Sequence, residues 1–358
     1  MSLARHPFVH EAFSSRAAES PAAIAIDAGD GRLVSYGDLQ RFASGIAVSL
    51  AAAGIAPADP VVIYAADRVE IVASMIGVLE AGCAFVPLTP DLPPARAARM
   101  LAASHATAAL VGAGAARDFA AALESAAREV IAIPIELRKA DLHPPRTTRG
   151  SDDFCYIFFT SGSTGEPKPI AGRLNAIDHF VRWEIAEMGI SAGSRVSQLI
   201  HPTFDAVLRD VFVPLCAGGT SCVPGQDALL DGERLLQWLE QSEIELVHCV
   251  PTLFRVLLPH IDSGQRLPRL RHVLLSGEPL TPADVAAWTS HFGTRIQLTN
   301  LYGPSETTMT KFVYRVTARD ARRRSIPIGQ PMPGVAALLL DDDGQVCAPR
   351  RVGEIYIR

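Results

Sequence analysis

The chain contains 358 residues, of which 48% are hydrophobic and 20% are charged. This length suits two or three packed subdomains with a sizeable core better than one simple layer. The formal net charge of −5 gives no indication of a nucleic-acid or membrane-surface partner. No apolar run reaches the roughly 18 residues of a membrane span, and the first ten residues do not resemble a signal peptide.

The cysteines form no C-x-x-C pair, and most of them lie in apolar stretches: Cys83, Cys155, Cys216, Cys222, Cys249 and Cys347. This usage predicts buried, reduced thiols and a cytoplasmic location.

Strand-like and helix-like segments alternate in the first 145 residues. The expected strands are 61–65, 84–88, 108–111 and 130–135. The expected helices are 70–81, 94–105 and 115–128. Gly82 stands where it can end the first of these helices, and Pro94 stands where it can begin the second. Such alternation predicts a mostly parallel sheet with helices on its faces.

A polar, proline-bearing break at 143–150 predicts a subdomain boundary. Further strands are expected at 154–159, 246–250, 272–275 and 296–299. From Ile326 the pattern becomes hairpin-like, with strands at 335–340 and 353–357 around a turn at 341–344. We therefore expect subdomains at 1–148, 149–325 and 326–358. Since the sequence stops at Arg358 within a strand-like run, we also expect that it is truncated.

A loop of small, hydroxylated and glycine residues, Thr160 to Lys168, follows the apolar strand 154–159. Glycines let backbone N–H groups approach an anion, and the hydroxyls and the lysine add donors and charge, so the loop suits a polyphosphate. It is not a Walker loop, because Pro167 and Pro169 prevent the helix that such a loop enters. A flexible surface loop is the alternative interpretation.

A second polar segment, 300–308, also directly follows an expected strand. Within it, Tyr302 offers an aromatic face, and Glu306 offers a hard oxygen ligand suited to Mg²⁺. The alternative is a turn made by Gly303 and Pro304 with an incidental tyrosine.

Seven segments, taken in order, resemble the core motifs of the adenylate-forming superfamily, and within it those of nonribosomal peptide synthetase adenylation domains. The segments are 33–39, 79–88, 160–168, 204–205, 300–307, 328–331 and 353–357. The resemblance implies an α/β fold: two stacked α/β subdomains and the start of a β-barrel subdomain, without the mobile C-terminal lid domain of the complete unit. Pro169 departs from the family pattern, which has glycine after the loop lysine.

The resemblance also implies residue roles in binding ATP and Mg²⁺. The phosphates would be held by Thr160, Ser161, Gly162, Ser163, Thr164, Gly165 and Lys168. The adenine site would be lined by Gly277, Glu278, Asn300, Tyr302 and Gly303. Ser305 would touch the α-phosphate and Glu306 would bind magnesium. The catalytic set would be Thr160, Lys168 and Glu306.

The resemblance places an amino-acid pocket around Asp205, which would pair with the substrate's α-ammonium group. The pocket residues would be Phe204, Asp205, Ala206, Arg209, His248, Leu274, Ser276, Leu301, Met309 and Thr310. Arg209 and His248 are unusual there. A buried arginine favours a carboxylate or a similar acceptor, which suggests an acidic or amide substrate side chain. Alternatively, Arg209 pairs with Asp210 or another acid of the protein and faces away.

The implied activity is adenylation of an amino acid, followed by thioester loading onto a phosphopantetheine carrier domain. The family's ribose-binding aspartate and lid lysine would follow Arg358. Loss of one such charged donor costs about 3–4 kcal/mol of transition-state stabilisation, so we expect slow turnover. Two alternatives remain: an acyl- or aryl-CoA synthetase, from which Asp205 would distinguish the chain, and a lid-less, non-catalytic nucleotide-binding module.

Overall fold

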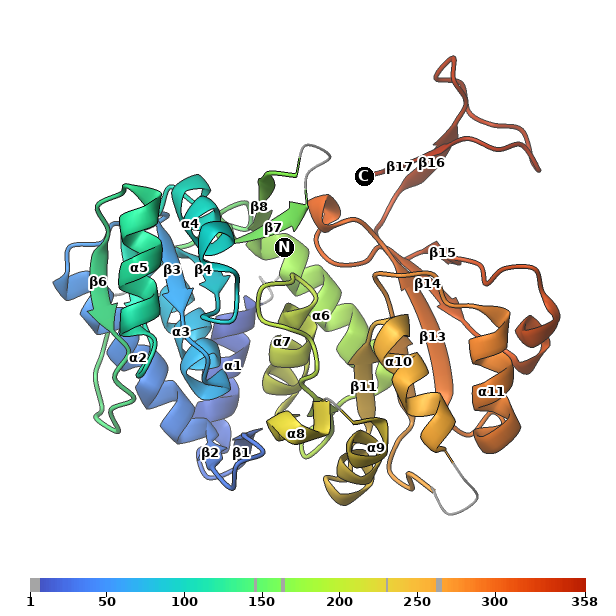
Figure 1. The fold of residues 1–358 in the computed structure, drawn as a ribbon, viewed down its shortest axis with the longest axis horizontal. Coiled ribbons are helices and arrows are strands. Elements are labelled where there is room, and N and C mark those ends of the chain that lie inside the picture. Colours follow the sequence, from blue (N-terminus) through green and yellow to red (C-terminus); the bar gives the residue numbers. More distant parts are fainter. Residues whose placement is uncertain (1–6, 145–146, 162–164, 230, 262–265) are drawn as a thin grey trace, which may run out of the picture.

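The computed structural model describes residues 7–144, 147–161, 165–229, 231–261 and 266–358. The predicted phosphate-binding residues Gly162, Ser163 and Thr164 lie outside these ranges. Two sheets with helices on both faces build the body of the molecule (Figure 1). This is the α/β architecture that the sequence predicts.

The first sheet has six strands in the order β6-β5-β3-β4-β7-β8. The strands are β3 (Pro60–Tyr64), β4 (Ala84–Leu88), β5 (Ala108–Val111), β6 (Ile131–Pro134), β7 (Phe154–Ser161) and β8 (Pro167–Arg173). All neighbours are parallel except β7 and β8, which form an antiparallel hairpin. The five predicted strands are confirmed. Strand β8 was not predicted; its two prolines lie on an edge strand, where proline is tolerated.

The second sheet has nine strands in the order β15-β14-β13-β12-β11-β9-β10-β1-β2. The strands are β1 (Ile24–Asp27), β2 (Leu33–Ser35), β9 (Arg195–Ser197), β10 (Thr220–Cys222), β11 (Leu246–Cys249), β12 (His272–Leu275), β13 (Gln297–Tyr302), β14 (Phe312–Arg315) and β15 (Gln330–Pro331). Sheet membership does not follow the predicted boundary at 148/149. The early strands β1 and β2 join this sheet, whereas β7 and β8 join the first one.

A central layer of helices lies between the sheets and shares one hydrophobic core with both. These helices are α1 (Val9–Glu19), α2 (Tyr36–Ala52), α3 (Arg68–Glu80), α6 (Leu174–Met188) and α7 (Val207–Ala217). Strand alternation separates this core from the outer ones. In β3, Val61 and Ile63 face the central core, whereas Val62 and Tyr64 face an outer core.

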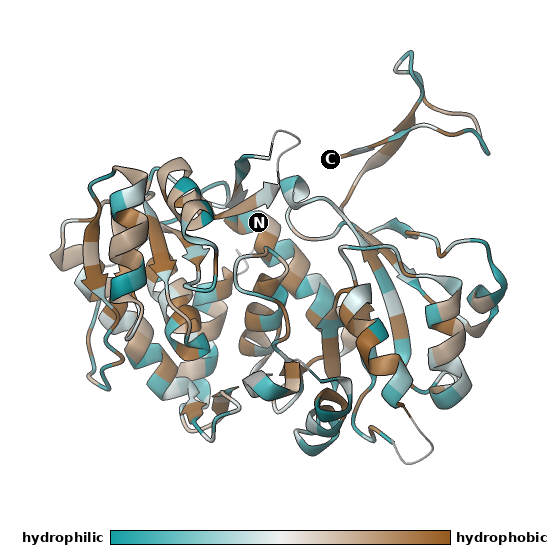
Figure 2. Ribbon diagram, in the orientation of Figure 1, coloured by the Kyte–Doolittle hydropathy of each residue, from teal (hydrophilic) through white to brown (hydrophobic). Residues whose placement is uncertain are grey.

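The outer faces of the two sheets have their own helices. The first sheet is covered by α4 (Pro94–Ala103) and α5 (Ala116–Ala126). The second is covered by α9 (Gly232–Gln241), α10 (Pro251–Leu257) and α11 (Pro282–Phe292). Figure 2 shows hydrophobic residues along β3 and β11, and residues of both kinds along the covering helices. Both faces of each sheet are therefore covered, as parallel strands require.

The remaining elements are short. They are α8 (Gln226–Leu229), η1 (Leu258–His260), η2 (Ser305–Thr307) and η3 (Ala318–Arg322). Two further strands, β16 (Ala337–Leu340) and β17 (Glu354–Ile357), pair as the predicted hairpin and extend away from the body (Figure 1). A β-barrel subdomain beyond this hairpin stays a prediction.

The cysteines are free, and four of them are buried. Burial raises the pKa of the Cys83 thiol to about 11, so this thiol is not a reactive thiolate near neutral pH. Among the helices of the described ranges, none combines the length and the apolar composition that a membrane span needs.

Candidate functional site

The candidate site lies where β11, β12 and β13 end. These strands are parallel neighbours, so their carboxyl ends meet at one edge of the sheet. Leu274 and Leu301 belong to the central core, so they face the α6–α7 side of the sheet. His248 lies on that side too, because it contacts both helices. Ser276, two residues beyond Leu274, contacts α7. Four predicted pocket residues thus share one face.

Asp205 lies in the helical turn that precedes α7. Its Oδ2 accepts a hydrogen bond from the backbone N–H of Met309 at 3.2 Å. Burial raises the pKa of this carboxyl, although hydrogen bonds from Ser305, Met309 and Ala206 and the charge of Arg209 oppose the shift. Since burial outweighs these contributions, a bound ammonium group would further stabilise ionised Asp205. The structure brings four predicted residues together here: Asp205, Ser305, Met309 and the adjacent Ala206.

Phe204 does not share this buried environment. Its side chain is 58% exposed, and its ring makes an edge contact with His201 at 6.2 Å between ring centroids. The Phe204 side chain is therefore exposed, whereas those of Arg209 and His248 are buried.

Arg209 is the predicted pocket residue with the most unusual surroundings. Its side chain is 1% exposed, and its Nη2 donates a hydrogen bond to Ser276 Oγ at 2.9 Å. Its Nε and Nη1 have no hydrogen-bond partner, and no described carboxylate forms an ion pair with it. The alternative expectation, pairing with Asp210 or another acid of the protein, is therefore wrong for the described residues.

Asp210 is instead part of a buried chain of three groups. His248 Nδ1 lies 2.8 Å from Asp210 Oδ1, and His248 Nε2 lies 2.5 Å from Glu184 Oε1. The other Asp210 oxygen accepts from the N–H of Ile200 at 2.8 Å. Burial would lower the pKa of His248, but the two carboxylates raise it above its ordinary value. The two carboxylates, one at each ring nitrogen, thus favour the protonated form of His248.

This chain predicts a pH dependence of stability. The folded-state pKa of His248 is raised, so its contribution is complete below the unfolded value of 6.5 and is lost as pH rises through the folded value. We expect the difference in melting temperature between the wild type and His248→Gln to be largest in mildly acidic buffer. It should shrink toward alkaline pH. Thermal melts of both proteins across pH 6–9 measure this, and a difference that grows with pH would contradict the assignment.

The residues predicted to line the adenine site are partly engaged by the protein. Tyr302 is 41% exposed and packs edge-on against Phe312. Asn300 donates from Nδ2 to the carbonyl of Pro327 at 2.8 Å, and the Glu278 carboxylate accepts from Thr252. Gly277 has φ +89°, a conformation that favours glycine. The Tyr302 ring is thus the exposed aromatic face of this set.

Gly303 permits a close backbone approach at the same edge of the sheet. A Cβ atom added there would lie 2.6 Å from Thr310 Cα. Glycine is therefore required for the segments around 303 and 310 to pack together, which places Thr310 beside Tyr302.

The predicted phosphate loop is the end of the β7–β8 hairpin, with Thr160 opposite Lys168 and Ser161 opposite Pro167. Gly165 follows the undescribed segment and has φ +81°. Lys168 Nζ lies 3.4 Å from Glu306 Oε1. The structure thus joins the two polar segments that the sequence analysis singled out separately.

Glu306 fits a magnesium site only as one ligand among several. The described part of the chain contains no group of three or more His, Cys, Asp or Glu side chains that could hold a metal. Mg²⁺ commonly takes one or two carboxylates together with substrate phosphates and water, so this donor set is compatible with it.

Some contacts at the site could not be predicted from the sequence. Thr308 and the predicted pocket residue Met309 have φ of 67° and 54°, which is uncommon for side chains of this size. The Tyr156 hydroxyl of β7 donates to Thr308 Oγ1 at 2.8 Å and helps to hold this strained turn. Glu184, Asp210 and Tyr156 form contacts between elements distant in sequence. The only sequence feature that could have identified Glu184 is its position as an acid on an otherwise apolar helix face.

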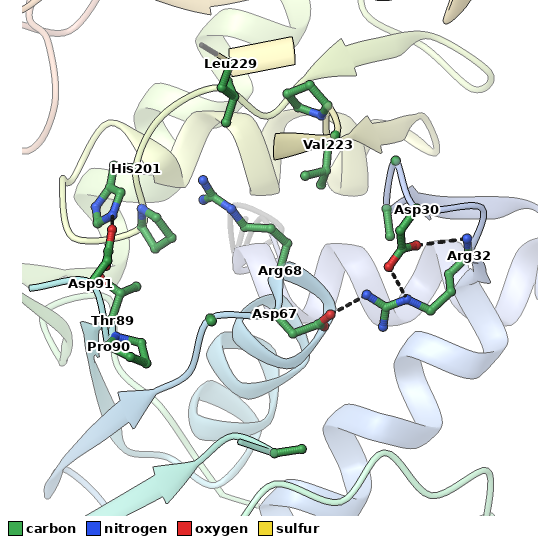
Figure 3. Close-up of a pocket in the computed structure, with 17 residues that line it drawn as sticks. Asp30, Arg32, Asp67, Arg68, Thr89, Pro90, Asp91, His201, Val223 and Leu229 are labelled. Carbon is green, nitrogen blue, oxygen red and sulfur yellow. Dashed lines mark hydrogen bonds and ion pairs between the residues drawn. The ribbon is translucent and has the colours of Figure 1, made fainter. Parts of the chain in front are cut away.

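A separate cavity of about 620 Å³ lies between the two sheets. Figure 3 shows Arg68 projecting into it, between the His201–Asp91 pair and the Asp30–Arg32–Asp67 cluster. None of the predicted site residues lines this cavity. The cavity is therefore distinct from the candidate site.

Comparisons with known proteins agree with this arrangement. Residues 13–358 match the family model described as AMP-binding enzyme. The chain is 33% identical over 351 residues to AMB antimetabolite synthetase AmbB of Pseudomonas aeruginosa, covering 98% of this chain and 27% of that protein. It is 29% identical over 364 residues to malpibaldin synthetase of Mortierella alpina, covering 98% and 6%. The chain thus spans only a small part of these relatives.

Solved structures are also similar. The nonribosomal peptide synthetase FmoA3 in its α-methyl-L-serine-AMP bound form matches with a TM-score of 0.85 at 24% identity, over 100% of this chain and 40% of that one. The N-terminal subdomain of Klebsiella oxytoca NpsA, in complex with 3-hydroxybenzoyl-AMSN, matches with a TM-score of 0.81 at 20% identity, over 98% and 87%. At these identities the likeness shows the fold.

Proposed function

Because the chain belongs to the family of AMP-binding enzymes, we propose that it uses ATP and Mg²⁺ to adenylate an amino acid. We further propose that the aminoacyl group passes to a phosphopantetheine thiol of a carrier domain, within nonribosomal peptide synthesis in the cytoplasm. The observation that carries the choice of substrate is Asp205. It is a partly buried carboxylate with a raised pKa, and it accepts a hydrogen bond from the backbone N–H of Met309.

The reaction begins when a carboxylate oxygen of the amino acid attacks the α-phosphorus of ATP. The bond to the bridging oxygen breaks, and pyrophosphate leaves with its electron pair. No general base is needed, because the carboxylate is already ionised near neutral pH. The protein's contribution is position and charge: Asp205 holds the ammonium group, Lys168 and Thr160 hold the phosphates, and Tyr302 packs against the base. Bound Mg²⁺, with Glu306 as one ligand, would neutralise phosphate charge. In the second step the thiol attacks the acyl carbon and AMP leaves.

Amino-acid-dependent exchange of labelled pyrophosphate into ATP tests the proposal. Exchange that requires both an α-amino group and Mg²⁺ supports it. Exchange with carboxylic acids that lack an amino group would instead favour an acyl- or aryl-CoA synthetase, a possibility kept open by the aryl-acid ligand of the NpsA structure. Nucleotide binding without exchange for any acid, in a protein that extends beyond Arg358, would favour the non-catalytic module.

The role of Tyr302 leads to a prediction for nucleotide binding. Stacking of a base on an aromatic ring contributes roughly 1–3 kcal/mol, so Tyr302→Ala should weaken ATP binding by about 5- to 150-fold. Tyr302→Phe keeps the ring and should bind ATP nearly as the wild type does. Calorimetric titration with ATP measures both, and equal affinity of the alanine variant and the wild type would exclude the stacking role.

A further inference from the structure

The Arg209 guanidinium has hydrogen-bonding capacity that the protein does not use. Only its Nη2 has a partner, Ser276 Oγ at 2.9 Å, whereas its Nε and Nη1 have none. The side chain is 1% exposed, so bulk solvent does not reach the two nitrogens that lack partners. A buried cation with unsatisfied donors is costly, and such groups usually have a partner. The missing acceptor therefore points to a bound molecule.

The position of Arg209 relative to Asp205 indicates which part of a substrate it meets. The backbone is helical from Phe204 onward, because the N–H of Leu208 bonds to Asp205 and that of Arg209 bonds to Ala206. Residues four apart on a helix share one face and are separated by about one turn, or 5.4 Å. Ala206, three residues before Arg209, lies beside this face and is small. An amino acid whose ammonium group binds Asp205 would thus extend its side chain over Ala206 toward Arg209.

The neighbouring acids do not neutralise Arg209, because His248 engages them. Asp210 contacts His248 and the N–H of Ile200, and Glu184 contacts the other nitrogen of His248. The charge of Arg209 is also attracted to Asp205, but no ion-pair contact joins these two side chains in the described residues. Glu184 and Asp210 are held on the imidazole of His248, so two nitrogens of the guanidinium remain available to an oxygen acceptor.

A second polar atom in the same region also has no partner. Thr310 Oγ1 is buried and without a hydrogen bond, and Thr310 follows Met309, whose N–H binds Asp205. An apolar substrate side chain would leave both Arg209 and Thr310 unsatisfied, whereas a polar end group offers them acceptors.

We propose that this chain selects an amino acid whose side chain ends in a carboxylate or carboxamide oxygen, which Arg209 binds. Glu184, His248 and Asp210 act as positioning residues that keep Arg209 available. This inference rests on the proposed adenylation of an amino acid and identifies its substrate class.

The test uses non-hydrolysable aminoacyl sulfamoyl-adenosines, titrated by calorimetry into the whole chain. The aspartyl and asparaginyl compounds are compared with the leucyl compound, which has nearly the same shape and no acceptor. The glutamyl and glutaminyl compounds are compared with the methionyl one. We expect at least one acceptor-bearing compound to bind on the order of 10- to 100-fold more tightly than its apolar match. Within the side-chain length that binds more tightly, comparison of the acid with its amide shows whether the site prefers a carboxylate or a carboxamide. Equal or tighter binding of the apolar compounds by the wild type would overturn the proposal.

Variants test the roles of the residues. Arg209→Met should reduce the preference to less than about threefold, because the methionine offers no donor to the oxygen acceptor. Arg182→Met, an exposed arginine of α6, is the matched control and should keep the preference. His248→Gln should release Asp210 toward Arg209 and reduce the preference, with the affinity for the leucyl compound unchanged. A merely structural role for His248 would lower the melting temperature and leave the ratio of affinities as in the wild type.

Different results would contradict amino-acid adenylation and the proposed substrate class. If no aminoacyl compound binds more tightly than sulfamoyl-adenosine itself, amino-acid adenylation fails. If apolar aminoacyl compounds bind best and Arg209→Met leaves their affinities unchanged, only the substrate class fails. The wild-type series is independent of variant folding, so the inference can be tested even if a variant does not fold.

Discussion

Asp205→Asn is expected to weaken binding of an aminoacyl sulfamoyl-adenosine by roughly 30- to 5,000-fold. The substitution keeps the shape of the side chain and removes the charge opposite the substrate's ammonium group. Loss of one partner of a desolvated, hydrogen-bonded charge pair costs about 2–5 kcal/mol. Calorimetric titration of both proteins measures the change directly.

The control for this prediction is a ligand that lacks the α-amino group. The matching compound without an α-amino group should bind wild type and Asp205→Asn with similar affinity, as should ATP. The variant should fold at least as well as the wild type, because burial raises the pKa of the Asp205 carboxyl and makes its charge costly in the empty site. Equal losses for the amino and deamino compounds would contradict the ammonium-binding role.

Gly172→Ala is expected to lower the free energy of unfolding by roughly 1–3 kcal/mol or more, which is the usual cost of overpacking a core. Gly172 lies opposite Tyr156 in the β7–β8 hairpin. A Cβ at Gly172 would lie 1.8 Å from Tyr156 Cζ, so the ring would have to move. The ring is buried and its hydroxyl holds Thr308. Displacing it should also disturb the Thr308–Met309 turn that contacts Asp205, and so weaken aminoacyl binding.

Gly45→Ala is the matched control. Gly45 lies within α2, and the nearest atom to its added Cβ is Leu142 Cδ1 at 3.8 Å. Alanine is favoured over glycine in a helix interior by about 1 kcal/mol, so this variant should be as stable as the wild type or more stable. Urea unfolding of the three proteins, with calorimetric titration of the aminoacyl compound, measures both effects. If Gly172→Ala matched Gly45→Ala in both measurements, the close packing of Tyr156 would have no such role.

Much of the fold could be predicted from the sequence because its signals are local. Apolar runs bounded by glycine and proline predicted β3, β4, β5 and β7 nearly to their ends. The break in pattern after Ile326 predicted the β16–β17 hairpin. The order of the strands in each sheet could not be predicted, because sheet membership depends on long-range packing. The first two strands, β1 and β2, join the second sheet by pairing with β10, nearly two hundred residues later.

The candidate site also has features that the sequence predicted and features that depend on long-range packing. Lys168 and Glu306 were predicted from two separate polar segments, and the structure brings their side chains together. For Arg209, the sequence left two interpretations open. Proximity along the chain favoured pairing with the adjacent Asp210, yet Asp210 faces His248.

The sequence by itself determined the predicted kind of chemistry, because residue types suited to phosphate, base and ammonium groups stand in short segments, two of which directly follow buried strands. Only the tertiary structure decided which charges meet. Neighbours along a helix, such as Arg209 and Asp210, point about 100° apart, so their partners come from other elements. His248 on β11 reaches both Glu184 on α6 and Asp210 on α7 only because the central helices pack against the inner face of the second sheet. That packing keeps Asp210 away from Arg209 and leaves the guanidinium free.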